Sequence, residues 1–147
     1  MTPVATIGYE DATVQRLLDA LQGAGVDLLV DVRAVANSRR PGFSKSRLAE
    51  NLGTVGIEYL HLRALGTPAE GRAAARAGRH DELRAVFTEH MATPAAQDEL
   101  ETLAGLVRAG RRVCLLCLEA DPAHCHRSMV ASALAERVPI EVVHLAP

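Results

Sequence analysis

The most constraining feature of this chain is the alternation of short apolar runs with longer segments of helical periodicity. Short apolar runs are typical of buried strands, whereas helices need longer periodic stretches. Strands that alternate with helices predict a mostly parallel sheet with helices on both faces. The runs that predict strands are residues 4–8, 26–32, 57–62, 112–118 and 140–144.

The segments between these runs carry the helical signals. The first follows Asp11, a residue type that caps helices, and its apolar residues recur at the spacing of one helix face. The other segments predicted to be helical are residues 45–55, 64–110, with a helix start at Thr93-Pro94, and 126–136. We therefore expect a three-layer, Rossmann-like α/β fold with a central sheet of about five strands.

Composition limits the class of protein. A chain of 147 residues, 48% of them hydrophobic and with a net charge of −2, suits one globular domain over residues 1–147. The first residues lack the pattern of a signal peptide, and no apolar run is long enough to span a bilayer. Three cysteines without an export signal favour free thiols in a reducing cytoplasm. We expect a cytoplasmic protein with no membrane partner.

Polar residues follow three of the predicted strands at the point where each strand ends. The carboxyl ends of parallel strands form the edge at which open α/β sheets bind ligands. The alternative for Asp31 and Arg33 is that they only satisfy nearby backbone groups or each other. We expect six side chains to line one pocket at this edge: Tyr9, Asp31, Arg33, Cys117, Glu119 and, from the last helix, Arg127.

The fourth apolar run contains Cys114 and Cys117 and leads into a loop dense in reactive groups. Residues three apart on a strand point to opposite faces, so these two thiols cannot form a disulfide or share a metal. Cys114 is predicted to be a buried, unpaired core residue. Cys117 lies at the strand end, where it is either a functional thiol or a polar wall of the site.

The stretch His124-Cys-His-Arg127 opens the last predicted helix. It cannot form a zinc site alone, because neighbours on a helix point about 100° apart. A mixed site of Cys117, Cys125 and one histidine has no standard ligand spacing, and we predict no metal site. We place Cys125 in the first turn, where the helix dipole and Arg127 lower its pKa and the free amides favour an anion. Asp121-Pro122 is an alternative, earlier helix start.

Residues 33–47 carry five cations and no acid, which makes this loop a candidate anion site. The alternatives are a solvated basic surface and cations already neutralised by Asp31 or Glu119. Nucleic acid is a less favoured partner, because aromatic residues are scarce and the net charge is slightly negative. The five cations are Arg33, Arg39, Arg40, Lys45 and Arg47.

Several motifs resemble a bacterial family called domain of unknown function 488. The resemblance runs over nearly the whole chain and implies a single cytoplasmic α/β domain, but no activity. The chain departs from the family at Ala36, where proline is usual, and at His90, where an aromatic residue is common. The matching motifs are Thr6-Ile-Gly-Tyr-Glu10, Asp31-Val-Arg33, Ser38-Arg-Arg-Pro-Gly-Phe-Ser-Lys45, Gly56-Ile-Glu-Tyr59, Leu65-Gly-Thr-Pro68, Cys117-Leu-Glu119 and Cys125-His-Arg127.

A weaker resemblance links the chain to rhodanese-like sulfurtransferases. These enzymes carry Asp-Val-Arg at one strand end and a catalytic cysteine at another, followed by a loop and an Arg-Ser helix start. Asp31-Val-Arg33, Cys117 and Arg127-Ser128 fit that outline. The loop of this chain is longer and contains Glu119 and Asp121, which a loop that cradles a persulfide would not favour.

Three functions remain as hypotheses. The first is a small enzyme or ligand-binding protein that acts on an anionic or nucleotide-like small molecule. The second is a rhodanese-like sulfur carrier that uses Cys117, and the third is a nucleic-acid accessory module that uses the basic loop. No motif indicates a cofactor or an oligomeric state. The predicted catalytic residues are Cys117, Glu119, Cys125 and His126, and the predicted substrate-binding residues are Tyr9, Glu10, Asp31, Arg33, Ser38, Arg39, Tyr59 and Arg127.

Overall fold

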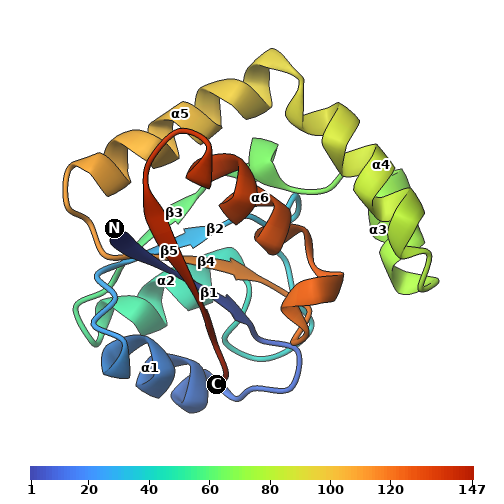
Figure 1. Cartoon of the computed structure of the whole chain (residues 1–147). Helices are drawn as coiled ribbons and strands as arrows, with labels where there is room; N and C mark the ends of the chain where they lie inside the picture. The colour runs from blue at the N-terminus through green and yellow to red at the C-terminus, as the bar shows by residue number, and fades with distance from the viewer.

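The computed structural model describes residues 1–147 and contains one five-stranded parallel sheet in the order β3-β2-β4-β1-β5 (Figure 1). The predicted three-layer, Rossmann-like fold is confirmed. The strands are β1 (Thr2–Gly8), β2 (Leu28–Asp31), β3 (Glu58–His61), β4 (Val113–Cys117) and β5 (Ile140–Leu145). The helices are α1 (Val14–Gly23), α2 (Lys45–Gly53), α3 (Ala69–Arg76), α4 (His80–Met91), α5 (Pro94–Arg108) and α6 (His126–Ala135), with 3-10 turns η1 (Arg63–Leu65) and η2 (Pro122–His124). None of these helices has the combination of length and hydrophobicity that a membrane span requires.

The alternation of side chains along β4 divides the core into two layers. Cys114 and Leu116 pack with the leucines of α1 and α2, whereas Leu115 and Cys117 pack with apolar residues of α4, α5 and α6. All three cysteines are buried and free. The prediction that Cys114 is an unpaired core residue on the face opposite Cys117 is therefore confirmed.

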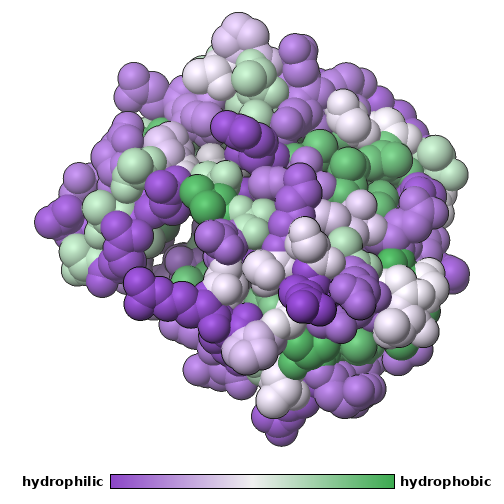
Figure 2. Space-filling model, turned by 180° about the vertical axis from the view of Figure 1, so that it is seen from behind, coloured by the Kyte–Doolittle hydropathy of each residue, from purple (hydrophilic) through white to green (hydrophobic).

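The long segment without strand signal, residues 64–110, is helical as predicted, but it is divided into separate helices. Helices α3 and α4 pack against each other as a hairpin on the side of the molecule toward which β1 and β4 point (Figure 1). Figure 2 shows a hollow rimmed mostly by hydrophilic side chains on the side where α3 and α4 lie. The hairpin thus forms one wall beyond the carboxyl edge of the sheet, a position that helical periodicity does not specify.

The cap of the first helix differs from the prediction. Thr13, not Asp11, caps α1, because its side chain accepts a hydrogen bond from the backbone N–H of Arg16. The helix begins at Val14, so Asp11 lies two residues too early to reach the free amides of the first turn. The prediction for Asp11 is wrong.

The end of β1 lies directly under the loop that follows β4. The backbone N–H groups of Tyr9 and Glu10 donate to the carbonyl oxygens of Cys117 and Leu118, at 3.2 and 2.8 Å. A Cβ atom added at Gly8 would lie 1.8 Å from the carbonyl oxygen of Glu119. Only glycine allows this approach, which brings the loop of Glu119 onto the strand end.

We expect Gly8→Ala to destabilise the protein, because the new methyl group meets backbone atoms that cannot turn away. Overpacking of this kind costs about 1–3 kcal/mol. Gly105→Ala is the matched control: Gly105 lies exposed within α5, and its added Cβ would meet nothing within 4 Å. That change should raise the free energy of unfolding by roughly 0.5–1 kcal/mol. Urea unfolding of both variants measures the difference, and equal stability changes would contradict the close approach at Gly8.

Candidate functional site

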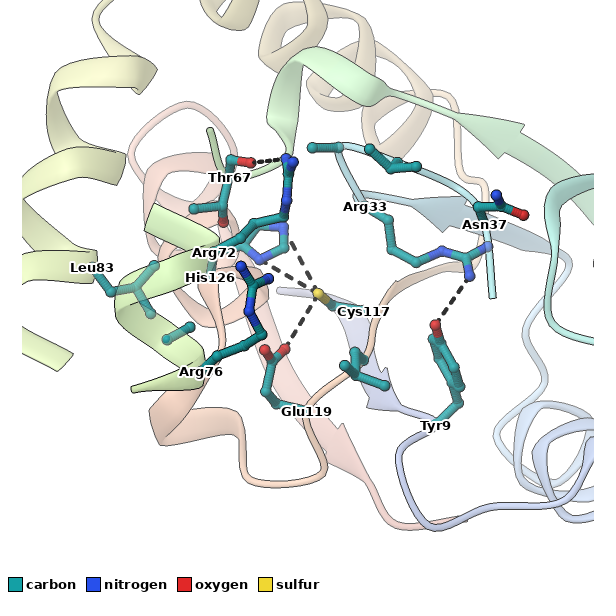
Figure 3. A pocket seen from close by; sticks show the side chains of 14 residues that line it. Tyr9, Arg33, Asn37, Thr67, Arg72, Arg76, Leu83, Cys117, Glu119 and His126 are labelled. Carbon is teal, nitrogen blue, oxygen red and sulfur yellow. Dashed lines mark hydrogen bonds between the residues drawn. The ribbon is translucent and has the colours of Figure 1, made fainter. Parts of the chain in front are cut away.

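A cavity of about 180 Å³ lies at the carboxyl edge of the sheet, between the ends of β1, β2 and β4 and the helices α3 and α4. Seven of its fourteen lining residues are hydrophobic, and the others bring polar groups from separate parts of the chain (Figure 3). The sequence-predicted site residues that line it are Tyr9, Arg33, Cys117, Glu119 and His126. The predicted ligand edge of the sheet is therefore hollow, and it gathers these five side chains.

Three polar side chains meet at one wall of this cavity. The sulfur of Cys117 lies 3.4 Å from His126 Nδ1 and 3.5 Å from Glu119 Oε2 (Figure 3). Cys117 and His126 are buried, with 5% of each residue exposed. A thiol, an imidazole and a carboxyl group at these distances can exchange a proton.

The orientation of His126 is set by its other ring nitrogen. Nε2 lies 2.7 Å from the carbonyl oxygen of Val32, the residue after β2. A carbonyl oxygen only accepts, so Nε2 carries the proton in the neutral ring, and the lone pair of Nδ1 faces the sulfur atoms. His126 is the first residue of α6, so the helix and the end of β2 together fix the ring.

Cys125 does not lie in the first turn of α6, and that prediction is wrong. It is the N-cap residue, with an extended backbone at φ −126° and ψ 140°. The earlier start at Asp121-Pro122 is instead the separate turn η2, which Asp121 caps. The extended backbone ends the turn before the helix begins, and the Cys125 sulfur lies buried 4.0 Å from His126 Nδ1.

The two thiols of this cluster titrate in opposite directions. A hydrogen bond with Cys125, together with burial, raises the pKa of Cys117. Burial opposes ionisation of Cys125, but the hydrogen bonds from Cys117 and His126 and the charges of His126 and Arg127 outweigh it and lower the pKa of Cys125. The two thiols therefore titrate as a pair that holds one negative charge between its sulfur atoms more readily than two.

Glu119 has an unusual protonation equilibrium for a carboxyl group. Burial and the negative charge of Cys125 raise the pKa of Glu119 to about 7. A carboxyl group with such a pKa holds its proton for part of the time at neutral pH and can act as an acid or as a base. The proton-transfer role of Glu119 stays a prediction, and such a pKa suits that role.

Asp31 and Arg33 form a buried ion pair. Arg33 Nε lies 2.9 Å from Asp31 Oδ1, and Nη2 lies 2.7 Å from Oδ2. Arg33 also donates to the hydroxyl of Tyr9 at 3.2 Å and to the carbonyl of Phe43, and Tyr59 donates to Asp31 at 2.5 Å. Burial acts against the charge of Arg33, but Asp31 raises the pKa of Arg33 above its ordinary value. Asp31 and Tyr59 stand behind the cavity and hold Arg33 at its wall.

Arg127 is fully buried and lies beneath the loop after β4. Its guanidinium donates to the hydroxyl of Thr6 at 3.2 Å and to the carbonyl oxygens of Glu119 and Ala120. Arg127 does not line the cavity. All of its hydrogen bonds tie the loop and α6 to β1.

The basic loop does not form one cationic surface. Arg33 is paired with Asp31, and Arg40 donates to the backbone carbonyls of Tyr9, Glu10 and Ala12. Arg39 is exposed and lies outside the cavity. The predicted residues Ser38 and Glu10 bind backbone amides, those of Arg40 and Ala120, and so shape the neighbouring loops.

Four polar residues of the cavity were not predicted: Asn37, Thr67, Arg72 and Arg76. Arg72 and Arg76 lie one helical turn apart on α3, and their side chains extend toward the cavity (Figure 3). Arg72 donates to the carbonyl oxygen of Thr67 at 3.0 Å, and neither arginine forms an ion pair. The sequence did contain a signal for these two arginines, because their i, i+4 spacing in an Ala-rich segment places them on the same face of a helix.

One group of side chains has the arrangement of metal ligands. Each of Cys117, Cys125 and His126 offers one ligand atom, and these atoms all lie within 4.8 Å of one another. The prediction of no metal site rested on the lack of a standard spacing in the sequence. The fold joins a strand end to a helix start and brings the three donors together without such a spacing.

We expect Asp31→Ala to lower the free energy of unfolding by about 3–5 kcal/mol, because it leaves the guanidinium of Arg33 buried without its carboxylate. Asp81→Ala is the matched control, because Asp81 and Arg84 form an exposed ion pair on α4. Exposed pairs contribute less than about 1 kcal/mol. Chemical denaturation measures both values, and a loss at Asp31 no larger than that at Asp81 would show that the buried pair is not important for stability.

The comparison with protein families agrees with the motifs. A family model described as domain of unknown function DUF488 matches residues 13–134, a range that contains every predicted site residue except Tyr9 and Glu10. No curated protein and no solved structure matches the chain. The match covers most of the 147 residues, so the chain belongs to the DUF488 family.

Proposed function

We propose that this protein is an enzyme that acts on a small anionic molecule in the cavity, with Cys117 as the nucleophile. One observation carries the proposal: the Cys117 sulfur lies in the cavity wall, 3.4 Å from a nitrogen of His126 whose partner nitrogen is fixed by Val32. A nucleophile within reach of a base that a third group orients is the shared arrangement of covalent catalysis by cysteine.

The reaction step follows from this cluster. The proton of the Cys117 thiol moves to the sulfur of Cys125 when that thiol is ionised, or to Nδ1 when His126 is neutral, and the Cys117 sulfur attacks an electrophilic centre of the substrate. A bond forms between that centre and sulfur, and the bond to the leaving group breaks with its electron pair. Glu119, with a pKa of about 7, lies 3.5 Å from the sulfur and can protonate the leaving group. A later attack by water or a second substrate releases the bound group.

The charges around the cavity favour an anionic substrate. Arg72 and Arg76 project from α3 and have no carboxylate partner. Arg33 also lines the wall, but its charge is balanced by Asp31. The two unpaired arginines can bind a carboxylate or phosphate group through charge-assisted hydrogen bonds while the rest of the molecule reaches Cys117.

The rhodanese-like sulfur carrier and the nucleic-acid accessory module are less well supported. Glu119 stands 3.5 Å from the Cys117 sulfur, where a loop that cradles the anionic persulfide of a sulfur carrier would present hydrogen-bond donors instead. The basic loop offers nucleic acid fewer free cations than its sequence indicates, because Arg33 and Arg40 are occupied and only Arg39, Lys45 and Arg47 are exposed. Persulfide formation on Cys117 with thiosulfate would favour the sulfurtransferase.

Alkylation tests the nucleophile and the anion site together. We expect iodoacetamide and the anionic iodoacetate both to modify Cys117, identified by fragmentation of the peptide. Arg76→Ala should slow the reaction with iodoacetate roughly fivefold relative to iodoacetamide, which corresponds to about 1 kcal/mol of lost charge attraction. Arg84→Ala is the control, because Arg84 pairs with Asp81 outside this cavity and should leave the ratio unchanged.

Two cysteine variants serve as controls. Cys114 faces the opposite side of the sheet, so the Cys114→Ser protein should be alkylated at the wild-type rate, whereas the Cys117→Ser protein should lose the modification. Two results would contradict the proposal. Modification of Cys125 in place of Cys117 in the wild type would reject the nucleophile. An equal effect of Arg76→Ala on both reagents would reject the anion site while leaving the thiol in place.

A further inference from the structure

We propose that Cys117, Cys125 and His126 bind a thiophilic divalent cation of the Zn²⁺ type through their two sulfur atoms and Nδ1. The three donors are buried, and their ligand atoms all lie within 4.8 Å of one another. This site goes beyond the proposed function and does not rest on it. All three ligands lie close together because they come from the end of β4 and the start of α6.

The distances agree with the size of such an ion. Tetrahedral zinc holds sulfur at about 2.3 Å and nitrogen at about 2.0–2.1 Å, which places neighbouring ligand atoms roughly 3.5–3.8 Å apart. His126 Nδ1 lies 3.4 Å from the Cys117 sulfur and 4.0 Å from the Cys125 sulfur. These two distances are close to that spacing, and all three ligand atoms lie within 4.8 Å of one another, so only a short approach of the donors would be needed to surround an ion.

The surroundings of His126 match those of a metal ligand. A ligating histidine donates its second ring N–H to a carbonyl or carboxylate, which fixes the ring and directs the free lone pair to the metal. His126 Nε2 lies 2.7 Å from the carbonyl oxygen of Val32, and Nδ1 faces both sulfurs. The partner of Nε2 is a backbone carbonyl group, so the imidazole ring of His126 is oriented before any ion binds.

The fourth position of the ion faces the cavity. Cys117 and His126 line the cavity, and Glu119 Oε2 lies 3.5 Å from the Cys117 sulfur. Glu119 or an anion from the cavity can therefore complete a tetrahedron. Two thiolates balance the charge of a divalent ion, which makes burial of the whole group feasible.

Metal binding and the nucleophilic chemistry exclude each other. The ion would occupy the Cys117 sulfur and the lone pair of His126 Nδ1, the two atoms that covalent catalysis needs. A bound ion should therefore protect Cys117 from alkylation. The cluster then has a thiol form, which can react, and a metal form, which cannot.

Cobalt titration of the reduced protein without oxygen provides a direct test. We expect one equivalent of Co²⁺ to produce thiolate-to-metal charge-transfer bands and the intense visible bands of tetrahedral cobalt, and Zn²⁺ to displace it. Cys117→Ser, Cys125→Ser and His126→Ala should each weaken the affinity by more than about tenfold. Cys114→Ser is the matched control and should bind as the wild type does, because Cys114 lies in the other core layer.

Protection of Cys117 from alkylation gives a second test, which uses the wild-type protein alone. We expect one equivalent of Zn²⁺ to suppress iodoacetamide modification of Cys117, and a chelator to restore it. Absence of the charge-transfer bands, or zinc binding that leaves Cys117 as reactive as before, would overturn the metal site. If Cys117 resists alkylation without metal, the proposed nucleophile fails, but the cobalt spectrum still decides the metal site.

Discussion

The buried guanidinium of Arg127 is the interaction on which the candidate site depends. It has no carboxylate partner, and its hydrogen bonds go to the hydroxyl of Thr6 and to two carbonyl oxygens of the loop after β4. A buried charge without a counter-charge is costly. Arg127 is among the groups that lower the pKa of Cys125, and it thereby favours a negative charge on the neighbouring pair of thiols. The same arginine therefore fixes the loop of Glu119 and stabilises the charged form of the thiol cluster.

A second buried charge, that of Arg33, lies in the wall of the cavity itself. Asp31 balances Arg33, and the hydroxyls of Tyr9 and Tyr59 complete the hydrogen bonds of the pair. Because each member is held by several partners, the wall keeps its shape without a ligand. Hydrogen bonds to charged groups are stronger than neutral ones, and here they serve mainly to hold the loop after β2 in place.

The two proposals describe two states of one cluster. The sulfur of Cys117 and Nδ1 of His126 serve covalent chemistry when no cation is bound, and they serve as ligands when one is. Arg72 and Arg76, on α3, have no role at the Cys117 sulfur in either state. Their position at the cavity suits an anion, whether a substrate or the fourth ligand of a bound ion.

The sequence alone determined the sheet of parallel strands, the opposite facing of Cys114 and Cys117, and the gathering of Tyr9, Arg33, Cys117 and Glu119 at one edge. These features follow from side-chain periodicity and from the common edge of parallel strand ends, which are local rules. Only the tertiary structure decided that Arg127 lies buried under the loop, that α3 brings Arg72 and Arg76 to the cavity, and that Cys125 caps α6 beside Cys117. Those positions depend on how separate elements pack, and no periodicity within a single segment encodes the packing between segments.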